Sequence, residues 1–330
     1  MNDKTVSNTF DMLITALETN NYNALDSLFH EDIHFNSSAY GLAENKTDCI
    51  KLIREKDIEA DQRKIRIFNN VIKTSSDHTA VQSVYTILFF GKMVNGFMHI
   101  FQCGFLNMLH YTKLGDEWKI TSFNSNMTFE CGNSLMVSDK WNLIDYSRFQ
   151  GNDRHILDQE DNPFHYEDSE TEEEKIRNCF YEYCWLIDMN RFESLHKVYK
   201  DPFLMKNEKL KDYKDGKEMS VKDSVTIFQK TRNTKSTFGE YTIPKEAVWN
   251  HIAHFEKLNI NGNNAEALIY RYEPNRIGTR FLHRYNMKTI YYSGQWKIVF
   301  QKDDDCWRIH QFEFESGIIE DLNEEDKRYF

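Results

Sequence analysis

Two side chains capable of acid–base chemistry lie close together on one predicted helix. The stretch CFYEYCWLIDMNRFESLHKVYKD, residues 179–201, places Tyr183 five residues before Asp188, and its helical pattern breaks at residues 189–191. A carboxylate can hold a basic side chain in place, and a tyrosine hydroxyl can polarise a substrate oxygen. Five helical steps set the two side chains about 140° apart, so both reach one pocket only if the chain bends near Asp188. The alternative is a structural role, with Tyr183 in the core and Asp188 capping the helix end.

The same helical stretch has a weaker copy in the first half of the chain. Two pairs of segments match in residue type and order: Tyr22-x-x-Leu25-x-x-Leu28-Phe29 with Phe192-x-x-Leu195-x-x-Val198-Tyr199, and Trp118-Lys119-Ile120 with Trp307-Arg308-Ile309. In both halves the helical patterns come first and the strand-like patterns follow. One order of elements that recurs in two halves is typical of a tandem duplication.

Each copy predicts one α+β domain. The first copy has helical patterns at residues 10–17 and 22–29, a short alternating pattern at residues 33–35 and a third helical pattern at residues 50–60. Only strand-like patterns follow, at residues 65–74, 79–90, 96–113 and 117–130. Three helices followed by a meander of strands favour one curved antiparallel sheet folded over the helices. The chain thus predicts two such domains.

An acidic segment separates the two copies. Between residues 151 and 175 the chain has ten acidic side chains and only two basic ones. Such a segment buries too little apolar surface to order itself and is typical of a solvated linker. We therefore predict domains at residues 1–135 and 172–330, joined by an acidic linker at residues 136–171.

Composition excludes several classes of function. The net charge of -11 repels nucleic-acid phosphates and anionic membrane surfaces. No apolar run approaches the roughly 18 residues that a membrane-spanning helix needs, and the start of the chain has no signal-peptide pattern. The six cysteines form no Cys-x-x-Cys pair, and there is neither metal-ligand spacing nor a glycine-rich phosphate loop. We expect a cytoplasmic protein with reduced thiols and with no metal, cofactor, nucleic-acid or membrane partner.

This layout resembles the SnoaL-like branch of the nuclear transport factor two-like superfamily. The resemblance covers roughly residues 7–131 and 172–316. It rests on the Tyr-x4-Asp helix end, on Asp32 and Asp201 after the second helices, on the Gly-Asn-Asn-Ala turn at residues 262–265, and on the aromatic-basic-Ile closing strands. The resemblance implies two cone-shaped, cystatin-like domains, each with a pocket at its open end. It also implies that the halves pair within one chain as a pseudo-dimer.

The second half is most similar to dehydratases of the scytalone and bile-acid type. That similarity implies a histidine fourteen residues before the alanine of the turn, which is His251, and assigns acid–base work to Tyr183, Asp188 and His251 together. Asp188 would orient His251 as the base, and Tyr183 would bind the substrate oxygen. The position four residues after the histidine departs from the family pattern, because it is Phe255 instead of Asn.

The first half lacks this set of residues. Leu13, Glu18 and about Arg63 stand where Tyr183, Asp188 and His251 stand in the second half. We therefore expect a structural first domain, or one whose pocket has different contents.

Three functions remain open. The second domain could be a cofactor-independent dehydratase or isomerase that acts on a small, apolar, oxygenated molecule. The same pocket could bind such a ligand without catalysis. The chain could instead serve as an assembly module, because its strands hold more Phe and Tyr than one sheet face can bury against the helices.

Overall fold

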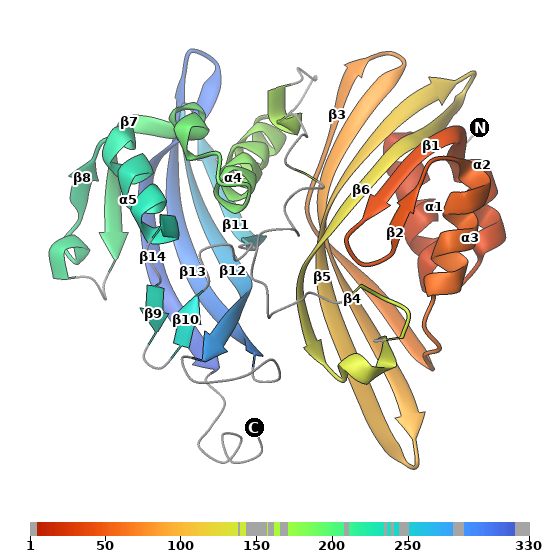
Figure 1. Ribbon diagram of the computed structural model, residues 1–330. Coiled ribbons are helices and arrows are strands. Elements are labelled where there is room, and N and C mark those ends of the chain that lie inside the picture. The colour runs from red at the N-terminus through yellow and green to blue at the C-terminus, as the bar shows by residue number, and fades with distance from the viewer. Residues whose placement is uncertain are drawn as a thin grey trace. The chain divides into compact units, whose positions relative to one another are not determined.

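The computed structural model describes residues 5–137, 139–142, 157, 162–165, 171–207, 211–233, 236–238, 241–243, 251–279 and 287–320. The chain divides into two compact units (Figure 1). The first unit comprises residues 1–145 and 152–168, and the second comprises residues 146–151 and 169–330.

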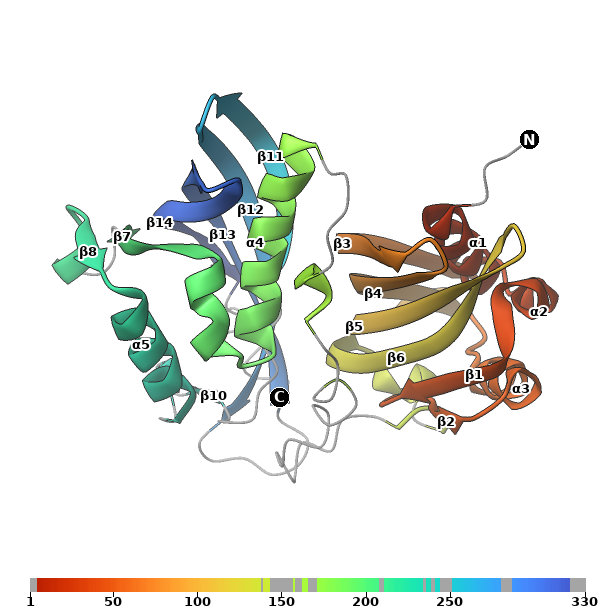
Figure 2. The same cartoon turned by 90° about the horizontal axis from the view of Figure 1, so that it is seen from above.

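Polar side chains cap two of the helices of the first unit. Its helical segments are α1 (Val6–Glu18), η1 (Tyr22–Ala24) running into α2 (Leu25–Leu28), and α3 (Lys46–Lys56). The side chain of Thr5 accepts a hydrogen bond from the backbone nitrogen of Asn8, and Asn45 caps α3 in the same way through Asp48. These three helical segments cover one face of the sheet, and a cluster of buried apolar side chains fills the space between (Figure 2).

The first sheet has six strands in the order β2-β1-β6-β5-β4-β3. The strands are β1 (Phe29–Ser37), β2 (Gly41–Ala43), β3 (Gln62–Ser76), β4 (Thr79–Val94), β5 (Phe97–Leu114) and β6 (Glu117–Gly132). The long strands β3 to β6 form an antiparallel meander, as predicted, but β1 runs parallel to β6. The sheet is mixed because β1 reaches β6 from the helical segment, and no tight hairpin forces the two strands to be antiparallel.

The second unit repeats this order. Its helices are α4 (Glu172–Asp188), η5 (Phe192–Lys197), η6 (Lys211–Tyr213) and α5 (Val221–Asn233). Its strands are β7 (Tyr199–Asn207), β8 (Lys217–Met219), β9 (Ser236–Phe238), β10 (Tyr241–Ile243), β11 (Ile252–Asn261), β12 (Asn264–Thr279), β13 (Met287–Asp303) and β14 (Cys306–Glu320). Strand β7 runs parallel to β14, just as β1 runs parallel to β6. The predicted α+β class with two similar domains is confirmed.

The first unit continues beyond its last long strand. Trp141 lies six residues beyond the predicted boundary at residue 135, yet its side chain is buried among Tyr40, Phe90 and Phe101. Its Nε1 donates a hydrogen bond to the backbone oxygen of Lys56 over 2.7 Å. Much of the predicted linker, residues 136–171, lies outside the described residues. Within it, η2 (Ser134–Met136) ends where the linker was expected to begin, and η4 (Pro163–His165) contacts β3 and β4.

Candidate active site

Asp188 and His251 form a buried pair in the second unit. The Asp188 carboxylate binds the same residue twice: its Oδ1 lies 2.5 Å from the ring Nδ1 of His251, and its Oδ2 accepts from the backbone nitrogen of His251 over 2.9 Å. The exposed fraction is 1% for Asp188 and 3% for His251. Because a carboxylate accepts from Nδ1, we assign the proton to Nδ1, and Nε2 becomes the basic nitrogen of the ring.

The end of α4 explains how Asp188 reaches this position. The helix ends at Asp188, and Asn190 takes a left-handed backbone conformation with φ of 55°, so the helix breaks where the sequence predicted. Every side chain from Tyr183 to Asp188 is buried. The end of α4 is therefore enclosed all around its axis. Tyr183 contacts His251 through its ring and Asp188 contacts it through its carboxylate, although five helical steps separate them.

Aromatic rings enclose the imidazole of His251. The ring of Trp296, on β13, lies nearly parallel to it with centroids 6.1 Å apart and an interplanar angle of 16°. Tyr183 approaches edge-on, with ring centroids 6.3 Å apart. Phe312, on β14, contacts both Tyr183 and Trp296. This apolar enclosure strengthens the electrostatic interaction between the imidazole and the carboxylate that orients it.

Tyr183 is paired with a second tyrosine. Its ring lies edge-on to that of Tyr199, the first residue of β7, with ring centroids 5.7 Å apart and an interplanar angle of 70°. Burial raises the pKa of Tyr183 and of Tyr199 well above the usual range. Both side chains are therefore neutral hydroxyls that can donate a hydrogen bond at physiological pH.

The structure brings all three predicted site residues together. Tyr183, Asp188 and His251 occupy one cluster in the second unit. His254, three residues after His251, is exposed and does not join this cluster. Residues 283–285, whose His, Arg and Tyr side chains could also line a pocket, lie outside the described part of the chain.

Sequence reasoning missed Tyr199 and Trp296. Tyr199 matches Phe29 in the first copy. A tyrosine in one copy where the other copy has a phenylalanine adds a hydroxyl at a core position, and that difference could have identified Tyr199. The sequence did not distinguish Trp296 as a site residue, because a tryptophan on an alternating strand is commonly part of the hydrophobic core.

The first unit keeps half of this arrangement. Glu18, at the end of α1, accepts a hydrogen bond from the backbone nitrogen of Ile65 over 2.7 Å, as Asp188 does from His251. The residue in place of His251 is therefore Ile65, and the correspondence with Arg63 expected from the sequence is wrong by two residues. Arg63 pairs with Asp57 instead. The loops before the two strands differ in length, which obscured the register.

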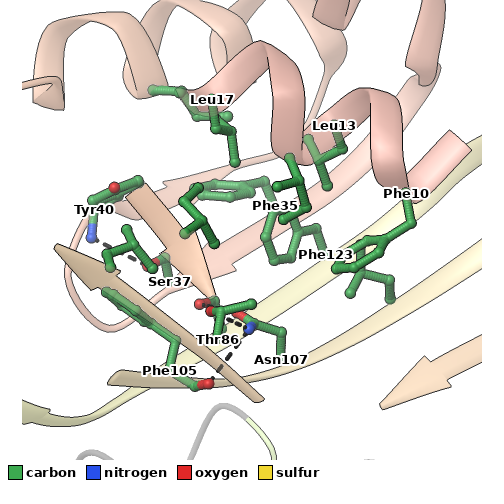
Figure 3. Close-up of a pocket in the computed structure, with 16 residues that line it drawn as sticks. Phe10, Leu13, Leu17, Phe35, Ser37, Tyr40, Thr86, Phe105, Asn107 and Phe123 are labelled. Atoms are coloured by element: carbon green, nitrogen blue, oxygen red, sulfur yellow. Dashed lines mark hydrogen bonds between the residues drawn. The ribbon is translucent and has the colours of Figure 1, made fainter. Parts of the chain in front are cut away.

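The first unit contains a different kind of site. A cavity of about 50 Å³ lies between α1 and the inner face of the sheet (Figure 3). Most of its wall is apolar, with Leu13 among the lining residues, and its polar lining comes from Ser37, Thr86, Asn107 and Ser125. The first domain thus has a pocket with different contents, one of the two alternatives expected from the sequence.

The described residues hold no group of three or more His, Cys, Asp and Glu side chains that could bind a metal ion. Within the same residues, no helix is both long and apolar enough to cross a membrane.

Comparison with known proteins shows similarity at the level of fold. Neither a protein-family model nor a curated protein matches the chain. A solved Kribbella flavida protein shares 14% identity, covering 47% of this chain and 96% of its own with a TM-score of 0.37. A nuclear transport factor 2-like superfamily protein from Salmonella enterica shares 11% identity over 37% of this chain and 87% of its own, with a TM-score of 0.31. A Caulobacter vibrioides protein with a cystatin-like fold shares 14% identity over 38% of this chain and 87% of its own, with a TM-score of 0.32.

Proposed function

We propose that the second unit is a cofactor-independent lyase or isomerase, with elimination of water as its reaction. One observation supports this proposal above all: a buried carboxylate fixes the tautomer of a buried histidine next to a neutral tyrosine hydroxyl. Such a set can remove a proton from carbon and stabilise charge on a substrate oxygen.

The proposed reaction begins at a carbon next to a carbonyl group. Nε2 of His251 takes the proton, while Tyr183 donates a hydrogen bond to the carbonyl oxygen. The electron pair of the broken C–H bond forms a carbon–carbon double bond, and the hydroxyl on the next carbon leaves with the proton as water. The imidazolium formed in between is stabilised by Asp188.

The surroundings define the class of substrate. Trp296, Phe312 and Phe180 pack against one another and against Tyr183. A site walled by aromatic rings with a few polar groups suits a small, largely apolar molecule that carries oxygen.

A library of small hydroxyl and carbonyl compounds tests this proposal. We expect at least one member to raise the melting temperature of the intact protein, and we expect His251→Ala to abolish that shift. A library in which no compound gives a shift that depends on His251 would contradict a site at His251. Conversion of the bound compound then separates catalysis from binding.

A second function, binding without catalysis, is favoured by the bond between Glu18 and Ile65. In the first unit, the carboxylate of Glu18 at the end of its helix anchors a strand although no histidine is present for it to orient. The carboxylate of Asp188 could therefore have the same structural role. Under this alternative, Asp188→Asn changes the affinity for the ligand, and wild-type protein leaves the ligand unconverted.

We also propose that the two units pair within one chain. This proposal rests on the sequence, because each meander has more Phe and Tyr than one face can bury against its helices. Small-angle scattering of the intact protein tests it. Scattering from one compact particle is expected, and two independently moving units would overturn pairing.

A further inference from the structure

The cavity of the first unit has an apolar wall and one polar end (Figure 3). Helix α1 contributes Phe10, Leu13 and Leu17, and the aromatic rings of Phe35 and Phe123 line the same space. The polar end is formed by Asn107 and the hydroxyls near it, on neighbouring strands. A mostly apolar pocket with a few convergent polar groups is the usual form of a small-molecule site.

The polar end is an ordered chain of hydrogen bonds. Ser125 Oγ donates to Asn107 Oδ1 over 2.7 Å, and Asn107 Nδ2 donates to Thr86 Oγ1 over 3.0 Å. All three residues are buried. Each bond polarises the next, so the chain strengthens the hydroxyl of Thr86 as a donor.

Two hydroxyl groups that line the cavity accept a hydrogen bond, and neither donates one to a described residue. Thr86 Oγ1 accepts from Asn107, and Ser37 Oγ accepts from the backbone nitrogen of Tyr40 over 3.3 Å. Within the described residues, no acceptor is found for the hydroxyl hydrogen of Thr86 or of Ser37. A buried donor without an acceptor costs free energy, which a ligand oxygen would recover.

Charge and size limit what can enter. Among the described residues, no charged side chain lines the cavity, so a carboxylate, phosphate or ammonium would lose its hydration without an ionic partner. The volume of about 50 Å³ is well below the roughly 150 Å³ of an apolar cavity that takes benzene. The space fits a group of a few non-hydrogen atoms.

We propose that this cavity binds a short, neutral molecule with a carbonyl oxygen, such as a ketone, aldehyde or amide. The oxygen accepts from Thr86, and the apolar part lies among the side chains of α1. This binding site is separate from the proposed reaction in the second unit. It gives the first unit a ligand of its own although Leu13 and Ile65 stand there in place of Tyr183 and His251.

Ligand-observed NMR on the intact protein tests the proposal, with acetaldehyde, which has three non-hydrogen atoms, as the probe. We expect saturation transfer to acetaldehyde and none to acetate, its charged analogue. Thr86→Val keeps the shape of the side chain and removes the hydroxyl, so it should weaken binding about 3- to 10-fold, the value of one neutral hydrogen bond. Thr86→Ser, which keeps the hydroxyl, should bind as the wild type does.

Two further variants make the result specific to this cavity. Leu17→Phe fills the space and should abolish transfer, whereas His251→Ala changes only the second unit and should leave it intact. The absence of transfer in wild-type protein would show that the cavity holds only water and would overturn the proposal. Equal transfer in wild type, Thr86→Val and Leu17→Phe would overturn it as well, as would binding of acetate in this cavity. Failure of the reaction proposed for the second unit would alter none of these results.

Discussion

Asp188 and His251 are joined by two hydrogen bonds with different roles. The bond from the backbone nitrogen to Oδ2 ties the start of β11 to the end of α4, and the first unit makes the same bond between Glu18 and Ile65. The bond between Oδ1 and the ring orients the imidazole and has no counterpart at Ile65, which has no side-chain nitrogen. One carboxylate therefore both anchors the fold and positions the proposed base.

Replacing Asp188 with Asn separates these two roles. An amide offers only one oxygen, so one of the two N–H groups of His251 would face an NH2 group. We expect a loss of about 1–3 kcal/mol in the free energy of unfolding, together with a shift of the ring proton from Nδ1 towards Nε2. Urea denaturation and nitrogen NMR of the imidazole measure these effects.

Glu18→Gln is the matched control for that change. It disturbs the corresponding strand anchor in the first unit, so it should lower stability while leaving the His251 spectrum unchanged. An unaltered His251 tautomer in Asp188→Asn would contradict the orienting role of the carboxylate.

High pH should unfold the protein through its buried tyrosines. Burial raises the pKa of Tyr183, Tyr199 and Tyr111, so the folded state favours their neutral forms. Their contribution to stability is complete below the pKa of about 10 of an exposed tyrosine, and it is lost as the pH rises from there towards the folded-state pKa. Tyrosinate absorbance should show these groups ionising only as the circular dichroism of the fold is lost.

Tyr183→Phe checks the alkaline prediction. It should reduce by one the number of tyrosines that ionise together with unfolding. Ionisation of Tyr183 in protein that is still folded would contradict the burial that the structure shows.

Trp141 should be essential to the stability of the first unit. Trp141→Ala removes a ring that packs against Tyr40, Phe90 and Phe101, at a cost of about 3–5 kcal/mol. Trp141→Phe keeps an aromatic ring but loses the hydrogen bond to Lys56, so it should cost less. Thermal unfolding of both variants measures this order. Wild-type stability in Trp141→Ala would instead mean that residues after β6 belong to a linker.

The sequence was sufficient for the order of the elements and for the three residues of the proposed site. Helical and alternating patterns report which side chains face a core, and the break after Asp188 follows from the tolerance of Asn190 for a left-handed conformation. The place of Trp141 in the core could not be predicted, because a single aromatic residue after a strand has no period to reveal what it packs against.

The cavity of the first unit was also beyond sequence reasoning. Its existence depends on how completely the side chains of α1 and the sheet fill the space between them, which is a property of packing and has no motif. Thr86, Asn107 and Ser125 lie on three different strands, and only the register of the sheet brings them together. Patterns along one strand cannot show that they form one chain of hydrogen bonds.

Exchange of carbon-bound hydrogen for solvent deuterium tests the central claim most directly. Small hydroxy ketones and hydroxy aldehydes would be incubated with intact protein in deuterated water, and deuterium next to the carbonyl measured by mass spectrometry. If His251 is the base, wild-type protein should accelerate exchange or elimination for at least one compound, and His251→Ala should reduce the rate by a factor of about 100 or more. Equal rates with wild type and His251→Ala, or no acceleration by wild type for any compound, would contradict the assignment of His251 as a catalytic base.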